Sequence, residues 1–169
     1  GPMLLSGYVG PAGPPFLEDG WLETGDRGRL DADGNLHVLG RRSDRIVTGG
    51  ENVDPVEVEQ ALESLPAVSA ACVFGVPDED WGEVVCAAVV LAPGRRPTAS
   101  DTAVANGTAA TGETGPTDVE ADIRGLRGRL APFKLPRRLA VLDSLPRNPT
   151  GKVDREETAR RAAGRLRAL

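Results

Sequence analysis

Cysteine and histidine are scarce in this chain of 169 residues, which contains two cysteines and one histidine. A structural zinc site takes four Cys or His ligands, so these three residues cannot complete one without carboxylates. Cys72 and Cys86 each lie within an apolar run, which predicts buried and unreactive thiols. His37 lies on an alternating strand pattern, and we assign it no role. The sequence therefore predicts no metal site.

Long apolar stretches are also missing, because there is no run of about 18 apolar residues and no signal-peptide pattern. We therefore expect a cytoplasmic protein with no membrane span and with reduced thiols. The net charge of −5 argues against nucleic acid as a partner of the whole surface. Basic residues do gather at 124–138 and 155–167, but the acids among them indicate solvated helix faces.

Residues 1–44 make up the first part of the predicted architecture. Residues 1–20 contain a short strand and a loop rich in proline and glycine, and such a strand needs a partner sheet. Residues 27–44 predict a hairpin with its turn at Asp33-Gly34. We take Gly1-Pro2 as native and expect the chain to begin within a larger fold. Residues 1–44 are thus assigned to the tail of a large N-terminal domain.

Helical and extended patterns alternate in residues 45–169. Two predicted strands, at about 68–76 and 83–91, are apolar throughout, so both faces of their sheet should be covered. A third short strand is expected at 139–142. Three helices carry apolar stripes at helical spacing: Val58, Ala61, Leu62 and Leu65; Val119, Ile123, Leu126 and Leu130; Ala159, Ala162, Ala163 and Leu166. The pattern predicts a small α+β domain with a short sheet and about three helices.

The helix starts carry capping signals. Asp54, Pro55 and Glu57 predict a capping box with proline at the first helical position. Asp154 and Glu157 predict another capping box at the last helix. By contrast, residues from about 95 to 116 are rich in Thr, Ala and Gly without any apolar period, which predicts a flexible insertion within this domain.

Three motifs stand out along the chain. Residues 21–26 are Trp-Leu-Glu-Thr-Gly-Asp, residues 40–52 are Gly-Arg-Arg-Ser-Asp-Arg-Ile-Val-Thr-Gly-Gly-Glu-Asn, and residues 145–152 are Leu-Pro-Arg-Asn-Pro-Thr-Gly-Lys. Alone, the second is compatible with a β-hairpin that has a glycine bulge. The third is not a phosphate-binding loop, because Pro146 replaces its first glycine and Val153 its Ser or Thr.

Together, the order and spacing of these motifs resemble the adenylate-forming ligases: acyl-CoA synthetases, luciferases and the adenylation domains of peptide synthetases. The chain is similar to the C-terminal third of such an enzyme over nearly its whole length. The resemblance implies that residues 45–169 form a mobile C-terminal lid domain. The Ser/Thr/Gly-rich loop that holds ATP phosphates in these enzymes has no counterpart here. We therefore expect a fragment, or a free-standing C-terminal domain, that is inactive alone.

The resemblance implies roles for three residues in forming the acyl-adenylate. Asp26 matches an aspartate that holds the ATP ribose, although it could equally be a turn residue. Arg41 matches a residue that touches ribose or phosphate, although alone it would be a surface charge. Lys152 matches the lysine that bridges the acyl carboxylate and the α-phosphate, where negative charge builds up. Most lone lysines are simply solvated.

The second motif is implied to serve the later step. Asp44 matches the hinge about which the lid domain rotates, although a surface turn acid is the alternative. Gly49, Gly50 and Glu51 match the loop that is presented for thioester formation. Glycines there would let the backbone lie close to a narrow pantetheine tunnel.

The implied reaction is ATP-dependent and forms AMP: a small carboxylic acid and ATP give an acyl-adenylate, and coenzyme A then displaces AMP. ATP with Mg²⁺ would be bound mainly by the N-terminal domain of the same ligase. The Gly-Gly-Glu-Asn form resembles aryl-type members, including o-succinylbenzoate-CoA ligase. Two alternatives stay open. The acceptor could be the thiol of a carrier protein, or the chain could be a non-catalytic module that docks on a partner.

Overall fold

The computed structural model describes residues 19–95 and 119–169. The chain forms two compact units, Gly1–Ser43 and Asp44–Leu169, and each is described by itself. The expected N-terminal strand lies outside the described residues, as does the expected flexible insertion apart from Arg95. No helix in the described ranges is long and apolar enough to cross a membrane.

The first unit contains an antiparallel hairpin of β1 (Asp26–Leu30) and β2 (Leu36–Arg41), as predicted. Its turn depends on Asp31, whose carboxylate accepts hydrogen bonds from His37 Nε2 at 2.7 Å and from the Asn35 amide at 2.9 Å. The bond from His37, followed by those from Asn35, lowers the pKa of Asp31 to about 2. His37, to which we assigned no role from the sequence, thus stabilises this turn through its hydrogen bond to Asp31.

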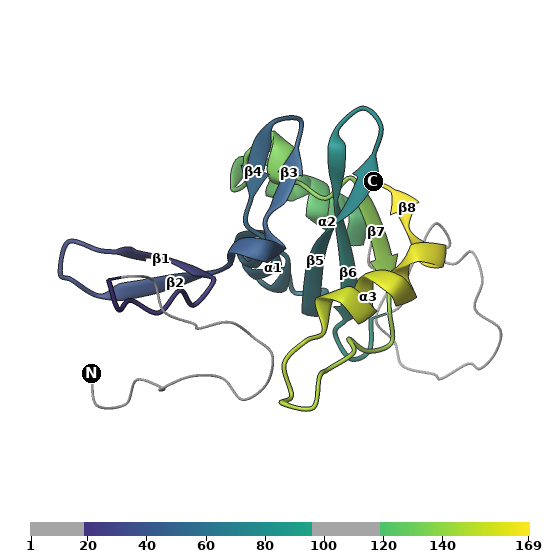
Figure 1. Cartoon of the computed structure of the whole chain (residues 1–169). Coiled ribbons are helices and arrows are strands. Elements are labelled where there is room, and N and C mark those ends of the chain that lie inside the picture. The colour runs from purple at the N-terminus through teal and green to yellow at the C-terminus, as the bar shows by residue number, and fades with distance from the viewer. Residues whose placement is uncertain (1–18, 96–118) are drawn as a thin grey trace. The chain divides into compact units, whose positions relative to one another are not determined.

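The second unit is built on a mixed sheet (Figure 1). Its two long strands, β5 (Val68–Asp78) and β6 (Gly82–Leu91), pair antiparallel along nearly their whole length. The other edge of β6 is shared by two strands. It pairs with β3 (Ile46–Thr48) only at Thr48–Gly82, and with β7 (Arg138–Val141) in parallel over Cys86–Val89. The sheet ends in β4 (Glu51–Val53) beside β3 and in β8 (Arg167–Ala168) beside β7.

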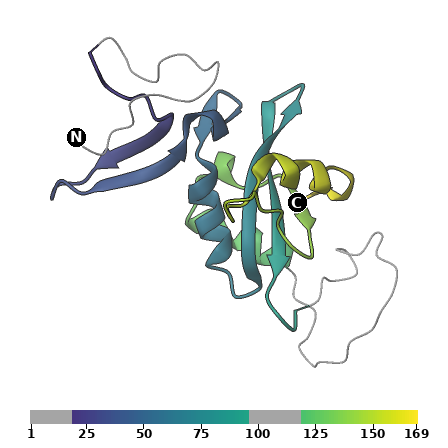
Figure 2. The ribbon, with the colours of Figure 1, turned by 60° about the horizontal axis from the view of Figure 1, so that its bottom comes forward.

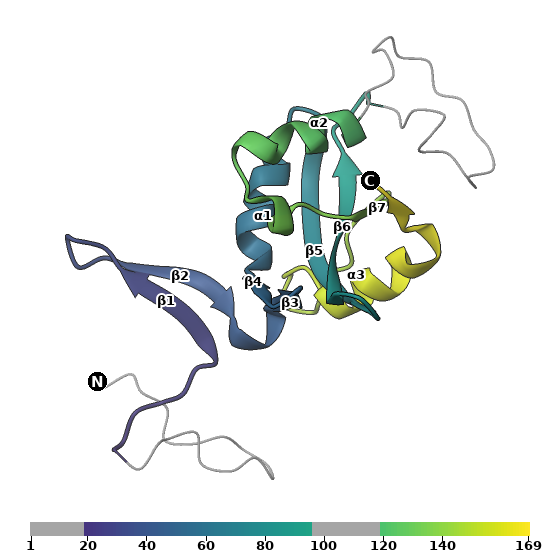
Figure 3. The ribbon, with the colours of Figure 1, turned by 90° about the horizontal axis from the view of Figure 1, so that it is seen from above.

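Helices cover both faces of this sheet, as the apolar strands predicted. One face packs against α1 (Pro55–Glu63) and α2 (Val119–Gly125), and the other packs against α3 (Arg155–Ala162) (Figure 3). Figure 2 shows α3 lying across β5 and β6. Alternate residues of β6 enter the two cores: Val85, Ala87 and Val89 on one side, and Val84, Cys86 and Ala88 on the other. The predicted α+β class, with about three helices, is confirmed.

Both thiols belong to the core beneath α3. Cys72 and Cys86 are fully buried and free. Burial raises the pKa of each thiol to about 11, because a thiolate is poorly solvated in apolar surroundings. The prediction of buried thiols is thus confirmed, and their raised pKa values favour the unreactive protonated form.

The predicted capping boxes are wrong in part. Asp54 stands at the N-cap of α1 but makes no side-chain cap hydrogen bond, and the Glu57 carboxylate instead binds Lys134 Nζ at 2.7 Å. At α3, Asp154 does accept from the Glu157 amide. The reciprocal bond is not made, because the Asp154 amide donates to the Pro146 carbonyl at 2.9 Å.

The predicted apolar stripes hold with one correction. Val58, Ala61 and Leu62 of α1 are buried, and Leu65, just beyond the helix, is half-buried. All four stripe residues are buried in the segment that contains α2 and the short 3-10 turn Leu126–Gly128. In the last helix, Ala163 is exposed and Thr158 is buried instead. The α-helix ends at Ala162, so the spacing that would bring Ala163 inward is lost.

Candidate functional site

Asp26 and Arg41 lie face to face in the first unit. They are partners in the β1–β2 register, and Arg41 Nε lies 2.9 Å from Asp26 Oδ1. The Arg41 guanidinium also donates to the Thr24 carbonyl at 2.8 Å, and Thr24 Oγ1 accepts from the Asp26 amide at 3.0 Å. The structure thus joins the two nucleotide-binding candidates into one exposed cluster.

Gly49 and Gly50 form the two-residue turn of the β3–β4 hairpin. Thr48 pairs with Glu51, and both glycines have positive φ, 57° and 82°, as a type I′ turn requires. The segment is therefore a tight hairpin without a bulge. A Cβ on Gly50 would meet nothing within 4 Å, whereas a Cβ on Gly49 would lie 2.8 Å from the Trp81 ring. Gly50 is the open position of the turn and Gly49 the packed one.

The turn between β5 and β6 supports the hairpin tip. The Gly49 amide donates to the Trp81 carbonyl at 2.9 Å. The Trp81 ring in turn lies under the Arg137 guanidinium, 3.6 Å from it, a distance at which a cation is attracted by an indole face. Neither Trp81 nor Arg137 was predicted as a site residue, because 56 positions of sequence separate them and neither belongs to one of the three motifs.

Lys152 lies at the end of a tight loop organised by Asn148. The Asn148 side-chain oxygen accepts from the amides of Thr150 and Lys152 at 3.1 and 3.0 Å, and from Thr150 Oγ1 at 2.7 Å. The Asn148 amide donates to the Lys152 carbonyl at 2.8 Å, and Gly151 has a φ of 83°. The loop is therefore pre-ordered by hydrogen bonds within itself, most of them to the Asn148 side chain.

The Lys152 side chain is exposed. Within residues 19–95 and 119–169, its ammonium group has no hydrogen-bond or ion-pair partner. The loop that carries it and the tip of the β3–β4 hairpin lie at opposite ends of the second unit (Figure 1). Because both loops belong to the same compact unit, any motion of that unit carries them together.

Asp44 is the first residue of the second unit. Its carboxylate Oδ2 lies 2.5 Å from Arg155 Nη1. Arg155 also donates to the Val73 carbonyl at 2.7 Å and to Glu59 Oε1 at 2.8 Å. One guanidinium thus ties the start of the unit to β5, to α1 and to the helix that follows the Lys152 loop.

The electrostatics of this cluster favour the charged guanidinium. Burial alone would lower the pKa of Arg155, but the charge of Glu59 and its hydrogen bond, with help from Asp44, outweigh burial and raise that pKa. The planar fork of arginine suits such a set of fixed acceptors, whereas a lysine would supply a single point charge.

Arg155→Met should destabilise the chain. The change leaves two carboxylates and a carbonyl without their shared donor. Since the Arg155 and Asp44 side chains are 26% and 31% exposed, we expect a loss of about 2–3 kcal/mol in the free energy of unfolding, less than for a fully buried pair. Urea unfolding should show a lower midpoint at an unchanged m-value.

Arg160→Met is the matched control for Arg155→Met. Arg160 pairs with Glu157 on the same helix, but its side chain is 66% exposed, so the loss should stay below about 0.5 kcal/mol. Equal shifts in the two variants would contradict the structural role given to Arg155.

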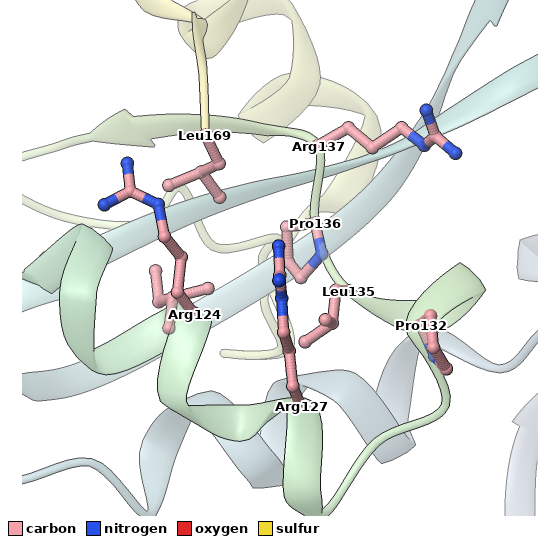
Figure 4. Close-up of a pocket in the computed structure, with 8 residues that line it drawn as sticks. Arg124, Arg127, Pro132, Leu135, Pro136, Arg137 and Leu169 are labelled. Carbon is pink, nitrogen blue, oxygen red and sulfur yellow. The ribbon is translucent and has the colours of Figure 1, made fainter.

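A hollow of about 480 Å³ lies elsewhere on the second unit, between α2, the turn at Pro132–Lys134 and the C-terminal residue Leu169 (Figure 4). Arg124 and Arg127 stand beside it, whereas the Arg137 guanidinium points away (Figure 4). None of the site residues predicted from the sequence lines it. In the part of the chain that the structure describes, no three or more His, Cys, Asp or Glu residues are grouped to hold a metal ion.

Comparison with known proteins identifies the family of the chain. Residues 57–152 match the family of AMP-binding enzyme C-terminal domains, and the chain belongs to this family. A fatty acid–acyl-carrier-protein ligase of Streptomyces coeruleorubidus is 44% identical over 83% of this chain and 23% of the relative. A 2-succinylbenzoate–CoA ligase of Bacillus mycoides is 38% identical over 93% of this chain and 28% of the relative.

Among solved structures, the o-succinylbenzoate-CoA synthetase of Bacillus subtilis in complex with its acyl-adenylate intermediate is 40% identical, with a TM-score of 0.65. The match covers 83% of this chain and 25% of that chain. This chain therefore spans only about a quarter of the length of its relatives. The resemblance to adenylate-forming acyl- and aryl-CoA ligases is confirmed.

Proposed function

We propose that this chain is the C-terminal part of an AMP-forming acid–thiol ligase and contributes residues to two successive reactions. In the first, a carboxylate oxygen of a small acid attacks the α-phosphorus of ATP, and pyrophosphate leaves. In the second, a thiol attacks the acyl carbon of the adenylate, and AMP leaves. The observation that carries the proposal is the placement of two pre-ordered loops at opposite ends of one compact unit.

Lys152 is the residue that we assign to the first reaction. Negative charge develops on the phosphorus oxygens and on pyrophosphate, and an ammonium group without a competing partner can approach them. Asp26 and Arg41 are assigned to the nucleotide, with Asp26 accepting from the ribose hydroxyls. ATP phosphates, Mg²⁺ and the acid are assigned to the N-terminal domain of the same ligase, because the Ser/Thr/Gly-rich phosphate loop has no counterpart in this sequence.

The Gly49–Gly50 turn and Glu51 are assigned to the second reaction. Gly50 carries no side chain and faces open space, so it allows a slender thiol arm to pass close to the backbone. Asp44 is assigned to the hinge, since it begins the unit and its side chain is held by that unit through Arg155. Rotation about Asp44 would withdraw Lys152 and present the hairpin to the same adenylate.

The first unit is assigned to the edge of the N-terminal domain. Leu30, Leu36 and Val38 of its hairpin are 65–68% exposed, and a two-stranded hairpin with an uncovered apolar face is marginal in water. Packing against a larger domain would bury these side chains.

Coenzyme A is the proposed acceptor, in keeping with relatives that are CoA ligases. A carrier-protein thiol is the second candidate, favoured by the 44% identity to a fatty acid–acyl-carrier-protein ligase. Both acceptors present a phosphopantetheine thiol, so the same hairpin would serve either.

A chimera tests the proposed function. The C-terminal segment of the Bacillus subtilis o-succinylbenzoate-CoA synthetase that matches this chain would be replaced by this chain, since the acyl pocket is expected upstream. The chimera should form o-succinylbenzoyl-AMP and then the CoA thioester, whereas the truncated synthetase and the 169-residue chain alone should form neither. A folded chimera that is inactive in both steps, or AMP formation by this chain alone, would overturn the proposal.

A further inference from the structure

The base of the β3–β4 hairpin has an unusual connection to the sheet. In an antiparallel pair, every second residue directs its amide away from its partner strand. In the β3–β4 register, the Val47–Asn52 pair lies between the Ile46–Val53 and Thr48–Glu51 pairs. The Val47 amide is therefore one that turns away from β4, and it points toward β6. Main-chain pairing with β6 occurs only at Thr48–Gly82. The Val47 amide is instead bound by a side chain: Glu83 Oε2 accepts from it at 2.8 Å.

Gly75 makes the room for this carboxylate. A Cβ on Gly75 would lie 2.4 Å from Glu83 Oε1 and 2.9 Å from Glu83 Cδ. No real Cβ tolerates such contacts, so any side chain at position 75 must displace the carboxylate. The φ of Gly75 is not positive, so its backbone conformation does not require glycine. The close approach of Glu83 requires glycine instead, and Ile46 Cγ2, 3.2 Å from the position of a Cβ, adds a lesser restriction.

We infer that Glu83, admitted by Gly75, is a positioning residue for the thiol-transfer hairpin. Two hydrogen bonds then hold the hairpin from the β5–β6 ribbon: Glu83 at Val47 and the Trp81 carbonyl at Gly49, the latter at 2.9 Å. The first fixes the base of the hairpin and the second fixes its tip. The consequence for thioester formation rests on the proposed function, whereas the clamp itself does not.

The first test measures amide hydrogen exchange by NMR in the full 169-residue chain. Glu83→Ala should speed exchange of the Val47 amide about tenfold, because its charged acceptor is lost. Glu83→Gln keeps an acceptor oxygen at the same reach and should restore most of the protection. Unchanged Val47 exchange in Glu83→Ala would overturn the inference.

Glu63→Ala is the matched control. Glu63 also accepts a strand amide, that of Ala71 at 3.1 Å, but this amide lies on β5 away from the hairpin. The variant should speed exchange at Ala71 and leave Val47 unchanged. Faster Val47 exchange in Glu63→Ala would show general loosening of the sheet and would count against a specific clamp.

Gly75→Ala provides an independent test. The new methyl group should push the carboxylate aside and speed Val47 exchange as much as Glu83→Ala does. Since the clashing atoms are the end of a flexible side chain, the fold should survive. In the Glu83→Ala background, Gly75→Ala should add little, because the carboxylate that it displaces is already gone and only the 3.2 Å approach to Ile46 Cγ2 remains. Additive effects would contradict the proposed arrangement.

The second readout separates this inference from the proposed function. In the chimera, Glu83→Ala should slow thioester formation from supplied acyl-adenylate about tenfold and leave adenylate formation unchanged. If Val47 exchange rises but transfer does not slow, Glu83 does not position the hairpin for transfer. If the unsubstituted chimera fails in both reactions, the proposed function fails, while the exchange data still decide whether the clamp exists.

Discussion

Lys152→Ala should slow adenylate formation in the chimera about 10²–10³-fold. The variant removes a positive donor from a site where charge develops only as pyrophosphate leaves, and one such donor is worth about 3–4 kcal/mol of transition-state stabilisation. Supplied with preformed acyl-adenylate and coenzyme A, the same variant should react at a near-normal rate, because no phosphorus centre then needs the cation. Single-turnover rates of the two half-reactions measure both effects.

Lys134→Ala is a suitable control for Lys152→Ala, because Lys134 is the other lysine of the sequence. Its Nζ lies 2.7 Å from both carboxylate oxygens of Glu57, so it is engaged, whereas the Lys152 ammonium has no partner within residues 19–95 and 119–169. The control should leave adenylation near normal. Equal loss of both half-reactions in Lys152→Ala would be incompatible with a role confined to adenylation.

Gly50→Leu should have the opposite effect, slowing thioester formation about 10²-fold or more while adenylate formation stays intact. The new side chain enters open space at the tip of the hairpin, where it would obstruct the thiol. Misplacing reacting atoms by about 1 Å is enough to cost a factor of this size. The same single-turnover assays, begun from preformed acyl-adenylate, give the measurement.

The backbone cost of Gly50→Leu needs a control of its own. A φ of 82° disfavours an L-residue by about 1–2 kcal/mol. Gly34 offers the match: it also turns a hairpin with a φ of 82° and has nothing within 4 Å of an added Cβ. Gly34→Leu should therefore show the cost of backbone strain without any obstruction of the thiol. If both variants slow transfer alike, or if Gly50→Leu slows both steps equally, the division of labour between the two loops is wrong.

Local patterns in the sequence predicted the elements well. The apolar runs at 68–76 and 83–91 give strands with two covered faces, since their alternate residues enter two cores. The turns at Asp33-Gly34 and Gly49-Gly50 follow from the positive φ that glycine tolerates. The division of residues 1–44 and 45–169 between two domains, and the flexible insertion, stay predictions.

The errors have a common cause in contacts between distant residues. Glu57 does not cap its own helix because Lys134, 77 positions away, binds its carboxylate. The Asp154 amide is not available for a capping box because Pro146 accepts from it. A capping signal reports what neighbouring residues can do, but a stronger partner from elsewhere in the fold takes precedence.

By itself, the sequence determined the class of domain and the two loops that we assign to chemistry, because short-range spacing and glycine conformation are local properties. Only the tertiary structure decided how those loops are held. Arg155 reaches Asp44 across 111 positions, and Glu83 reaches Val47 across 36. A side chain finds such partners only after the sheet has placed β3, β5 and β6 together, so no local pattern encodes them.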